Sequence, residues 1–246
     1  FSGLLEARAD PVPIPPMPTP QPMPTPQPMP APDQMPAPNQ MQPPAPAPVV
    51  YDPNKAIAYA KRFANPDNLP EDNWNRKYRR YDVEYDGAYD CANFVSQVLH
   101  ESGFPMTDEW YYDEESKFSS NAWRLAHEHY KYFSDKDNGY VEGDVIKVTS
   151  PEQLDTLYKE GKVEKGDLLY WDFYSDGKID HASLISSTDG ELKYTAHTGD
   201  VFDESVKGTY QSRYPNGTLY IVPLKKTPPE HDEPSWLGKL VDQGLY

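Results

Sequence analysis

Cysteine is almost absent from this chain, since Cys91 is the only one in 246 residues. A single thiol cannot form an intrachain disulfide, so no disulfide framework supports the fold. Neither a CxxC nor an HExxH spacing is present, and His127 and His129 stand two positions apart, where side chains on a helix point away from each other. We therefore expect no metal site and no cofactor, and any chemistry of Cys91 must be that of a free thiol.

Basic residues and long apolar runs are also scarce. The chain carries 23 Lys and Arg against 39 Asp and Glu, which gives a formal net charge of −16. Such a surface repels phosphate groups, which argues against nucleic acids and anionic membranes as primary partners. No stretch of about 18 apolar residues occurs, so no transmembrane segment is expected. Neutral, peptidic or sugar-bearing substrates remain, and we expect the protein to be a monomer.

The first 50 residues contain almost no charge and, after Phe1, no aromatic residue, whereas they hold 18 of the 28 prolines. Such a segment cannot build a hydrophobic core, and its composition predicts an extended polyproline II stalk over residues 1–50. Five methionines recur in it every six residues, a spacing that would place them on one side of such a helix: Met17, Met23, Met29, Met35 and Met41. This stripe could bind a partner, but a low-complexity stalk is the simpler interpretation.

A short stretch near the start of the chain favours export. Ala7-Arg8-Ala9 has the small-x-small form of a secretory cleavage site, and Phe1 to Leu5 are suited to the end of an apolar signal region. Together with the proline-rich stalk, these features predict a bacterial protein that is secreted or associated with the cell envelope.

Residues 51–224 have the aromatic and apolar content of one globular domain with one core, and an acidic, proline-containing tail follows over residues 225–246. Apolar spacing predicts helices first and strands later. The predicted helices cover residues 53–63, 91–101, 121–133 and 151–158, and the predicted strands cover residues 168–173, 179–186, 192–198 and 219–224. This order is typical of an α+β fold in which N-terminal helices pack on an antiparallel β-meander.

The only cysteine stands at the predicted start of the second helix. Apolar residues follow it at the spacing of one buried helical face, which Cys91 shares: Phe94, Val95, Val98 and Leu99. Asp90 is a suitable N-cap, and the positive end of the helix dipole is expected to lower the pKa of the thiol. Cys91 is then either an activated nucleophile or a small buried hydrophobic side chain, and the motif alone leaves both interpretations open.

Two histidines fall on the predicted strands. His181 begins the second strand, His197 lies near the end of the third, and a two-residue turn between these strands would pair position 181 with position 198. The two imidazoles should then lie close together, although histidines on strands are also common as structural groups. We therefore predict that Cys91 is a thiol nucleophile, with His181 as its base and His197 orienting His181. Backbone N–H groups at the helix start would bind the oxyanion, and residues beside the thiol would contact the substrate or the oxyanion: Tyr89, Asp90 and Asn93.

The order of these motifs resembles a known family. The motifs are Tyr89-Asp90-Cys91-Ala92-Asn93-Phe94-Val95-Ser96-Gln97, Lys165-Gly166-Asp167, Asp180-His181-Ala182 and Tyr194-Thr195-Ala196-His197-Thr198. Over residues 51–224 they are similar to the bacterial putative amidase domain family, which is related to the NlpC-type and CHAP cell-wall hydrolases of papain-like fold. The resemblance implies a Cys-His amidase or peptidase acting on peptidoglycan peptides, with Cys91 as nucleophile and His181 as base. It leaves the third catalytic position open between His197 and Asp200.

Two other functions fit the same sequence. One is a noncatalytic cell-envelope binding or assembly module that keeps the fold and the groove, although such a module would not need the thiol. The other is a cysteine protease or acyltransferase acting on proteins, which would use the same residues. The presence of both Cys91 and His181 favours the cell-wall hydrolase.

Overall fold

The structure is a computed structural model, and it describes residues 49–231 together with residues 234 and 235. The predicted stalk with its methionine stripe and most of the predicted tail lie outside the described residues. The described part consists of helices and antiparallel strands, which confirms the predicted α+β class. None of the helices in this part is long and apolar enough to cross a membrane.

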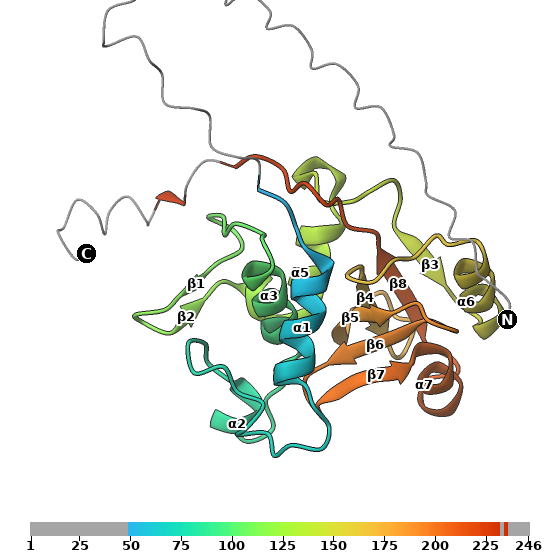
Figure 1. The fold of residues 1–246 in the computed structure, drawn as a ribbon, viewed down its shortest axis with the longest axis horizontal. Coiled ribbons are helices and arrows are strands. Elements are labelled where there is room, and N and C mark those ends of the chain that lie inside the picture. Colours follow the sequence, from blue (N-terminus) through green and yellow to red (C-terminus); the bar gives the residue numbers. More distant parts are fainter. Residues whose placement is uncertain (1–48, 232–233, 236–246) are drawn as a thin grey trace, which may run out of the picture. The chain divides into compact units, whose positions relative to one another are not determined.

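The first two long helices are where the sequence predicted them. Helix α1 covers Pro53–Phe63, and the side chain of Asp52 caps it by accepting a hydrogen bond from the N–H of Asn54 at 2.9 Å. Helix α3 covers Cys91–Glu101, and every residue from its start to Leu99 is buried. It packs against α1, against α5 (Ala126–Ser134) and against strand β5 (His181–Ser187), so it is the central helix of the domain (Figure 1).

The prediction of one helix over residues 121–133 is wrong. The segment forms α4 (Asn121–Arg124) and α5, and Leu125 between them has extended backbone angles, φ −106° and ψ 123°. The sequence between the first and third helices also contains a short helix that was not predicted, α2 (Tyr81–Glu84). Two further short strands, β1 (Tyr112–Asp113) and β2 (Phe118–Ser119), pair as a separate hairpin, and a 3₁₀ turn covers Lys136–Asn138.

Six antiparallel strands form the main sheet in the order β3-β8-β4-β5-β6-β7. The predicted strands correspond to β4 (Leu168–Asp172), β5, β6 (Lys193–Ala196) and β8 (Thr218–Val222). The edge strands β3 (Ile146–Val148) and β7 (Val201–Ser205) were not predicted. The predicted meander is present only as β4, β5 and β6, because β7 continues it and the predicted fourth strand, β8, pairs with the opposite side of β4.

The sheet separates two hydrophobic clusters, so the prediction of a single core is wrong. Along β4, Leu168 and Tyr170 face one cluster, whereas Leu169 and Trp171 face the other. Helices α1, α3 and α5 cover the first face, and α6 (Pro151–Lys159) and α7 (Val206–Arg213) cover the second (Figure 1). Because β4 is buried on both faces, it is a continuous apolar run rather than an alternating one.

The first residues of the predicted tail pack on the domain. The N–H of Tyr51 donates to the carbonyl of Lys226 at 2.7 Å, and the N–H of Lys225 donates to the carbonyl of Tyr140 at 2.9 Å. The ring of His231 stacks on Tyr140 and is 3.0 Å from its hydroxyl. The domain therefore extends through these residues to at least His231.

Candidate active site

Cys91 is the first residue of α3, and its side chain is almost fully buried, with 4% of the residue exposed. The backbone N–H groups of Ala182 on β5, of Ala92 and of Cys91 itself lower the pKa of the thiol. Burial nevertheless dominates and raises the pKa of the thiol to about 11, and the nearby charge of Asp90 acts in the same direction. The prediction of a thiol pKa lowered by the helix start is therefore wrong, because the N–H groups do not offset the loss of water.

His181 begins β5 and directly precedes Ala182, whose N–H lowers the pKa of the Cys91 thiol. Its ring stacks on Phe173 at 6.2 Å between ring centres. Within the described part of the chain, neither ring nitrogen forms a hydrogen bond with a protein atom. Burial lowers the pKa of His181 to about 4, so the ring is neutral at pH 7 and has a lone pair available to accept a proton.

His197 does not contact His181 in the way the sequence predicted. Its Nδ1 is 2.8 Å from Oδ2 of Asp90, its Nε2 hydrogen-bonds the carbonyl oxygen of Phe63, and its ring stacks on Phe94 at 3.9 Å. The predicted register holds for Leu184 with Thr195, but it shifts by one residue at Ser187, which pairs with Lys193, and β6 ends at Ala196. The chain therefore leaves the sheet before His197, whose ring packs on α3 instead of beside His181.

Asp90, which lies next to Nδ1 of His197, is fully buried and is the centre of a hydrogen-bond network, here called the hub. Its Oδ1 accepts hydrogen bonds from the N–H of Tyr81 at 2.8 Å and from Nδ2 of Asn93 at 2.9 Å, and its own N–H donates to Oγ1 of Thr198 at 2.9 Å. Its side chain does not cap α3, contrary to the prediction. Burial raises the pKa of Asp90, and the hydrogen bond from His197 opposes this rise. Asp90 thus ties two chain segments, at Tyr81 and at His197–Thr198, to the start of α3.

Of the three residues predicted to contact substrate, only Tyr89 is accessible, with 75% of the residue exposed. Asn93 is fully buried, its Nδ2 donates to the carbonyl of Arg79 at 2.8 Å, and its Oδ1 accepts from Nε1 of Trp123 at 2.9 Å. The polar atoms of Asp90 and Asn93 are committed to protein partners. Both are therefore positioning residues of the α3 start, and their burial argues against direct contact with substrate.

A buried ion-pair network adjoins this hub, and the sequence did not reveal it. Arg80 is 1% exposed, and its guanidinium lies 2.8 Å from Oδ1 of Asp82 and 2.6 Å from Oδ1 of Asp200. Oδ2 of Asp200 accepts from Nδ2 of Asn73 at 2.9 Å, and Nε2 of His197 is 3.7 Å from Oδ1 of Asp200. Asp200, the rival for the third catalytic position, is thus held by Arg80 rather than by His181.

Two adjoining cavities open at the site. The first, here called the thiol cavity, has a volume of about 540 Å³ and is lined by Cys91 together with Tyr81, Arg124, His127, Lys178 and others. The second, here called the aromatic cavity, has a volume of about 330 Å³ and is lined by His181 together with Trp171, Phe173, Tyr174, Tyr214 and others. Tyr89 and Asp180 line both cavities, so the nucleophile and the base border two neighbouring hollows.

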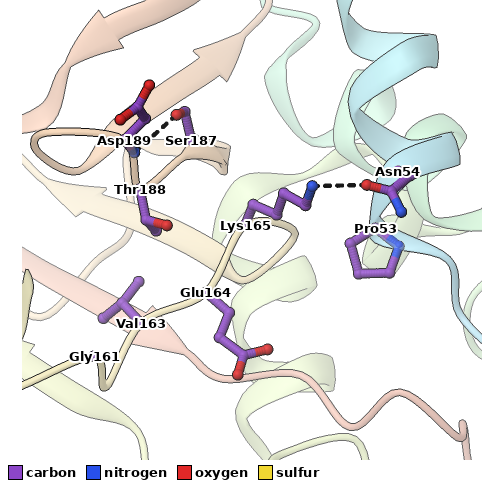
Figure 2. Close-up of a pocket in the computed structure, with 9 residues that line it drawn as sticks. All are labelled: Pro53, Asn54, Gly161, Val163, Glu164, Lys165, Ser187, Thr188 and Asp189. Carbon is purple, nitrogen blue, oxygen red and sulfur yellow. Dashed lines mark hydrogen bonds between the residues drawn. The ribbon is translucent and has the colours of Figure 1, made fainter.

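A larger hollow of about 670 Å³ lies elsewhere, between the start of α1 and the turn that joins β5 to β6 (Figure 2). Nζ of Lys165 donates to Oδ1 of Asn54 at 2.7 Å there, and neither Cys91 nor His181 lines it. We therefore place the candidate site at the two smaller cavities. Within the described residues, no cluster of three or more His, Cys, Asp or Glu side chains is suited to hold a metal ion.

Comparison with known proteins assigns the domain to a family. The profile of a family described as "Putative amidase domain" matches residues 50–222. The "Uncharacterized protein YhbB" of Bacillus subtilis (strain 168) is 28% identical over 145 residues, which cover 56% of this chain and 38% of that relative. No solved structure matches the chain significantly. Since the profile match spans the α3 start and all strands of the main sheet, the chain belongs to the putative amidase domain family, whose description indicates amide hydrolysis.

Proposed function

We propose that this domain is a thiol-dependent amidase that hydrolyses amide bonds in the peptides of bacterial peptidoglycan. The observation that carries the proposal is the position of Cys91 at the start of α3, bordering an open cavity that shares Tyr89 and Asp180 with the cavity lined by His181. A buried thiol that served only as packing would need neither the cavity nor a neighbouring imidazole with unpaired nitrogens.

The proposed reaction proceeds through an acyl-enzyme. The sulfur of Cys91 attacks the amide carbonyl carbon, its proton passes to His181, and the C=O π electrons move onto oxygen. When the tetrahedral intermediate collapses, the C–N bond breaks and His181 returns the proton to the leaving amine. Water then attacks the thioester, gives a proton to His181 and releases the carboxylic acid with the regenerated thiol.

The resting pair is neutral in this proposal. A thiol pKa of about 11 beside an imidazole pKa of about 4 opposes a preformed thiolate–imidazolium pair. Proton transfer must therefore accompany the attack on the carbonyl carbon. The neutral resting pair distinguishes the proposed site from one in which the cysteine is already a thiolate before substrate binds.

The substrate and location follow from the chain as a whole. A net charge of −16 favours neutral or peptidic substrates over nucleic acids, and the proline-rich segment before the domain suits a tether at the cell envelope. We propose that the protein is exported to that location and that its domain is papain-like, related to the NlpC-type and CHAP hydrolases. The order of elements supports this relation, since the cysteine helix precedes an antiparallel sheet that carries the histidine.

Purified protein incubated with peptidoglycan sacculi tests the proposal. The wild type should release new amino groups and soluble muropeptides, whereas Cys91→Ser and His181→Gln should lose at least about 10²-fold in rate. Lys165→Ala, which alters only the hollow of Figure 2, is the matched control and should retain the wild-type rate. Equal product from wild type and Cys91→Ser would refute the thiol mechanism, and cleavage of casein but not of sacculi would favour a protein substrate.

A further inference from the structure

The thiol cavity contains a second histidine that the proposed reaction leaves unused. His127 is the second residue of α5, and it lines this cavity together with Cys91. The spacing of His127 and His129 in the sequence predicted only that these two side chains do not bind one metal ion together. The structure separates these two residues, because His129 is fully buried against Tyr170 while His127 is partly exposed in the cavity.

A backbone contact determines the tautomer of His127. The N–H of Ile179 donates to Nδ1 of His127 at 3.2 Å. A backbone N–H cannot accept a hydrogen bond, so Nδ1 must hold the lone pair and the neutral ring carries its hydrogen on Nε2. Among the described residues, this Nε2–H has no protein acceptor. The Nε2–H is therefore available to donate a hydrogen bond to a ligand in the cavity that His127 lines.

The proposed reaction requires a donor at this place. Three backbone N–H groups stabilise negative charge on the sulfur itself, since they lower the pKa of the thiol: those of Ala182, Ala92 and Cys91. Additional donors are needed where negative charge develops on the carbonyl oxygen. The start of α5 also lacks a side-chain cap at Leu125, so the first turn of this helix contributes positive partial charge to the same cavity.

We propose that Nε2–H of His127 donates a hydrogen bond to the carbonyl oxygen of the scissile amide and stabilises the oxyanion that forms when Cys91 attacks. His127 keeps its proton throughout, while His181 accepts and returns the proton of the thiol. The two histidines thus have separate roles, one as oxyanion donor and one as base. This inference rests on the proposed thiol-dependent function, and it names a catalytic residue of the same site.

An aldehyde probe tests this role without a known substrate. N-Acetylalaninal forms a reversible hemithioacetal with a thiol, in which the S–C bond forms and the carbonyl oxygen becomes the oxyanion or hydroxyl. Its affinity is measured by the protection of Cys91 from iodoacetamide. His127→Phe should bind the aldehyde at least about tenfold more weakly than wild type, and His127→Gln should recover part of the loss because its amide still donates.

The controls separate this role from a structural one. Alkylation by iodoacetamide alone creates no oxyanion, so its rate should be the same in wild type, His127→Phe and His127→Gln. Lys131→Ala lies on the same helix outside the cavity and should leave both measurements unchanged. On sacculi, His127→Phe should lower kcat by about 10² to 10³-fold with little change in KM.

The outcomes distinguish the two proposals. Equal aldehyde affinity in wild type and His127→Phe would refute the role of His127 while leaving the thiol mechanism intact. If His127→Phe does not fold, aldehyde binding by His127→Gln more than a hundredfold weaker than wild type would refute the role, since a donor is present. A wild type that neither binds the aldehyde nor hydrolyses sacculi would refute the proposed function, and the role of His127 with it.

Discussion

The protonation state of Cys91 can be tested directly, because the chain has no other thiol. Burial raises the thiol pKa from 9.0 to about 11. At pH 7 the thiolate fraction is then ~10⁻⁴, compared with ~10⁻² for an unperturbed thiol. Since only the thiolate reacts, the folded protein should be alkylated about 100-fold more slowly than the unfolded chain from this cause alone.

The assay follows the rate of iodoacetamide labelling from pH 6 to pH 10.5 by intact mass, with the same chain in urea as the reference. The rate of the folded protein should rise about tenfold per pH unit through pH 10 without a plateau, because the pKa lies above that range. Restricted access of the reagent would lower all rates equally, so the midpoint of the curve, rather than its height, measures the pKa.

A plateau of high reactivity between about pH 5 and pH 8 would refute this reasoning, because it would require a thiolate–imidazolium pair in the resting protein. The variant His181→Gln provides the matched control. If the pair is neutral, as the pKa values of about 11 and about 4 imply, this variant should show the same pH profile as wild type. A large loss of reactivity near pH 7 in His181→Gln would instead support the ion pair.

Three further predictions concern stability, each measured by urea unfolding. Asp90→Ala leaves His197 and two other buried donors without an acceptor, so it should lower the unfolding free energy by about 3 kcal/mol, and a loss below about 0.5 kcal/mol would contradict the hub role. Burial raises the pKa of Asp167 from 3.8 to about 6, so the stability from its protonated form is present below pH 3.8 and is lost as the pH rises through 6. Wild type should therefore lose about 2 kcal/mol relative to Asp167→Asn between pH 4 and pH 7, and a difference independent of pH would count against the raised pKa. Gly103 has φ +127°, and an added Cβ would lie 2.5 Å from a backbone oxygen, whereas Gly87 at φ +73° has nothing within 4 Å. Gly103→Ala should thus cost clearly more than Gly87→Ala, and equal losses would show that the close approach is not restrictive.

Local rules were sufficient for much of the fold. The caps and apolar spacing predicted α1 and α3 with the correct bounds, because these signals act within a few residues. The predicted register of β5 with β6 also holds at Leu184 and Thr195, but a bulge shifts it by one residue next to the connection, which is longer than the predicted two-residue turn. The sequence did not predict the break at Leu125 or the edge strands β3 and β7, because the formation of short elements depends on the neighbours that they pack against.

Only part of the candidate site could be predicted from the sequence. Cys91 and His181 could be proposed from the sequence because each stands at the start of a predictable element. The contact of His197 with Asp90 was missed because it depends on where β6 ends and on the packing of its ring against α3. His127 was missed because it enters the thiol cavity only when α5 packs beside the loop that contains Ile179.

The sequence by itself determined that one thiol stands at a helix start and that a histidine begins a strand later in the chain, since periodicity, caps and turns are local properties. Only the tertiary structure decided what surrounds them. The desolvation that raises the pKa of Cys91, the hub at Asp90 and the donor at His127 all arise from contacts between residues far apart in the chain. Burial and long-range hydrogen bonds arise only when the chain packs, so the local patterns of the sequence do not reveal them.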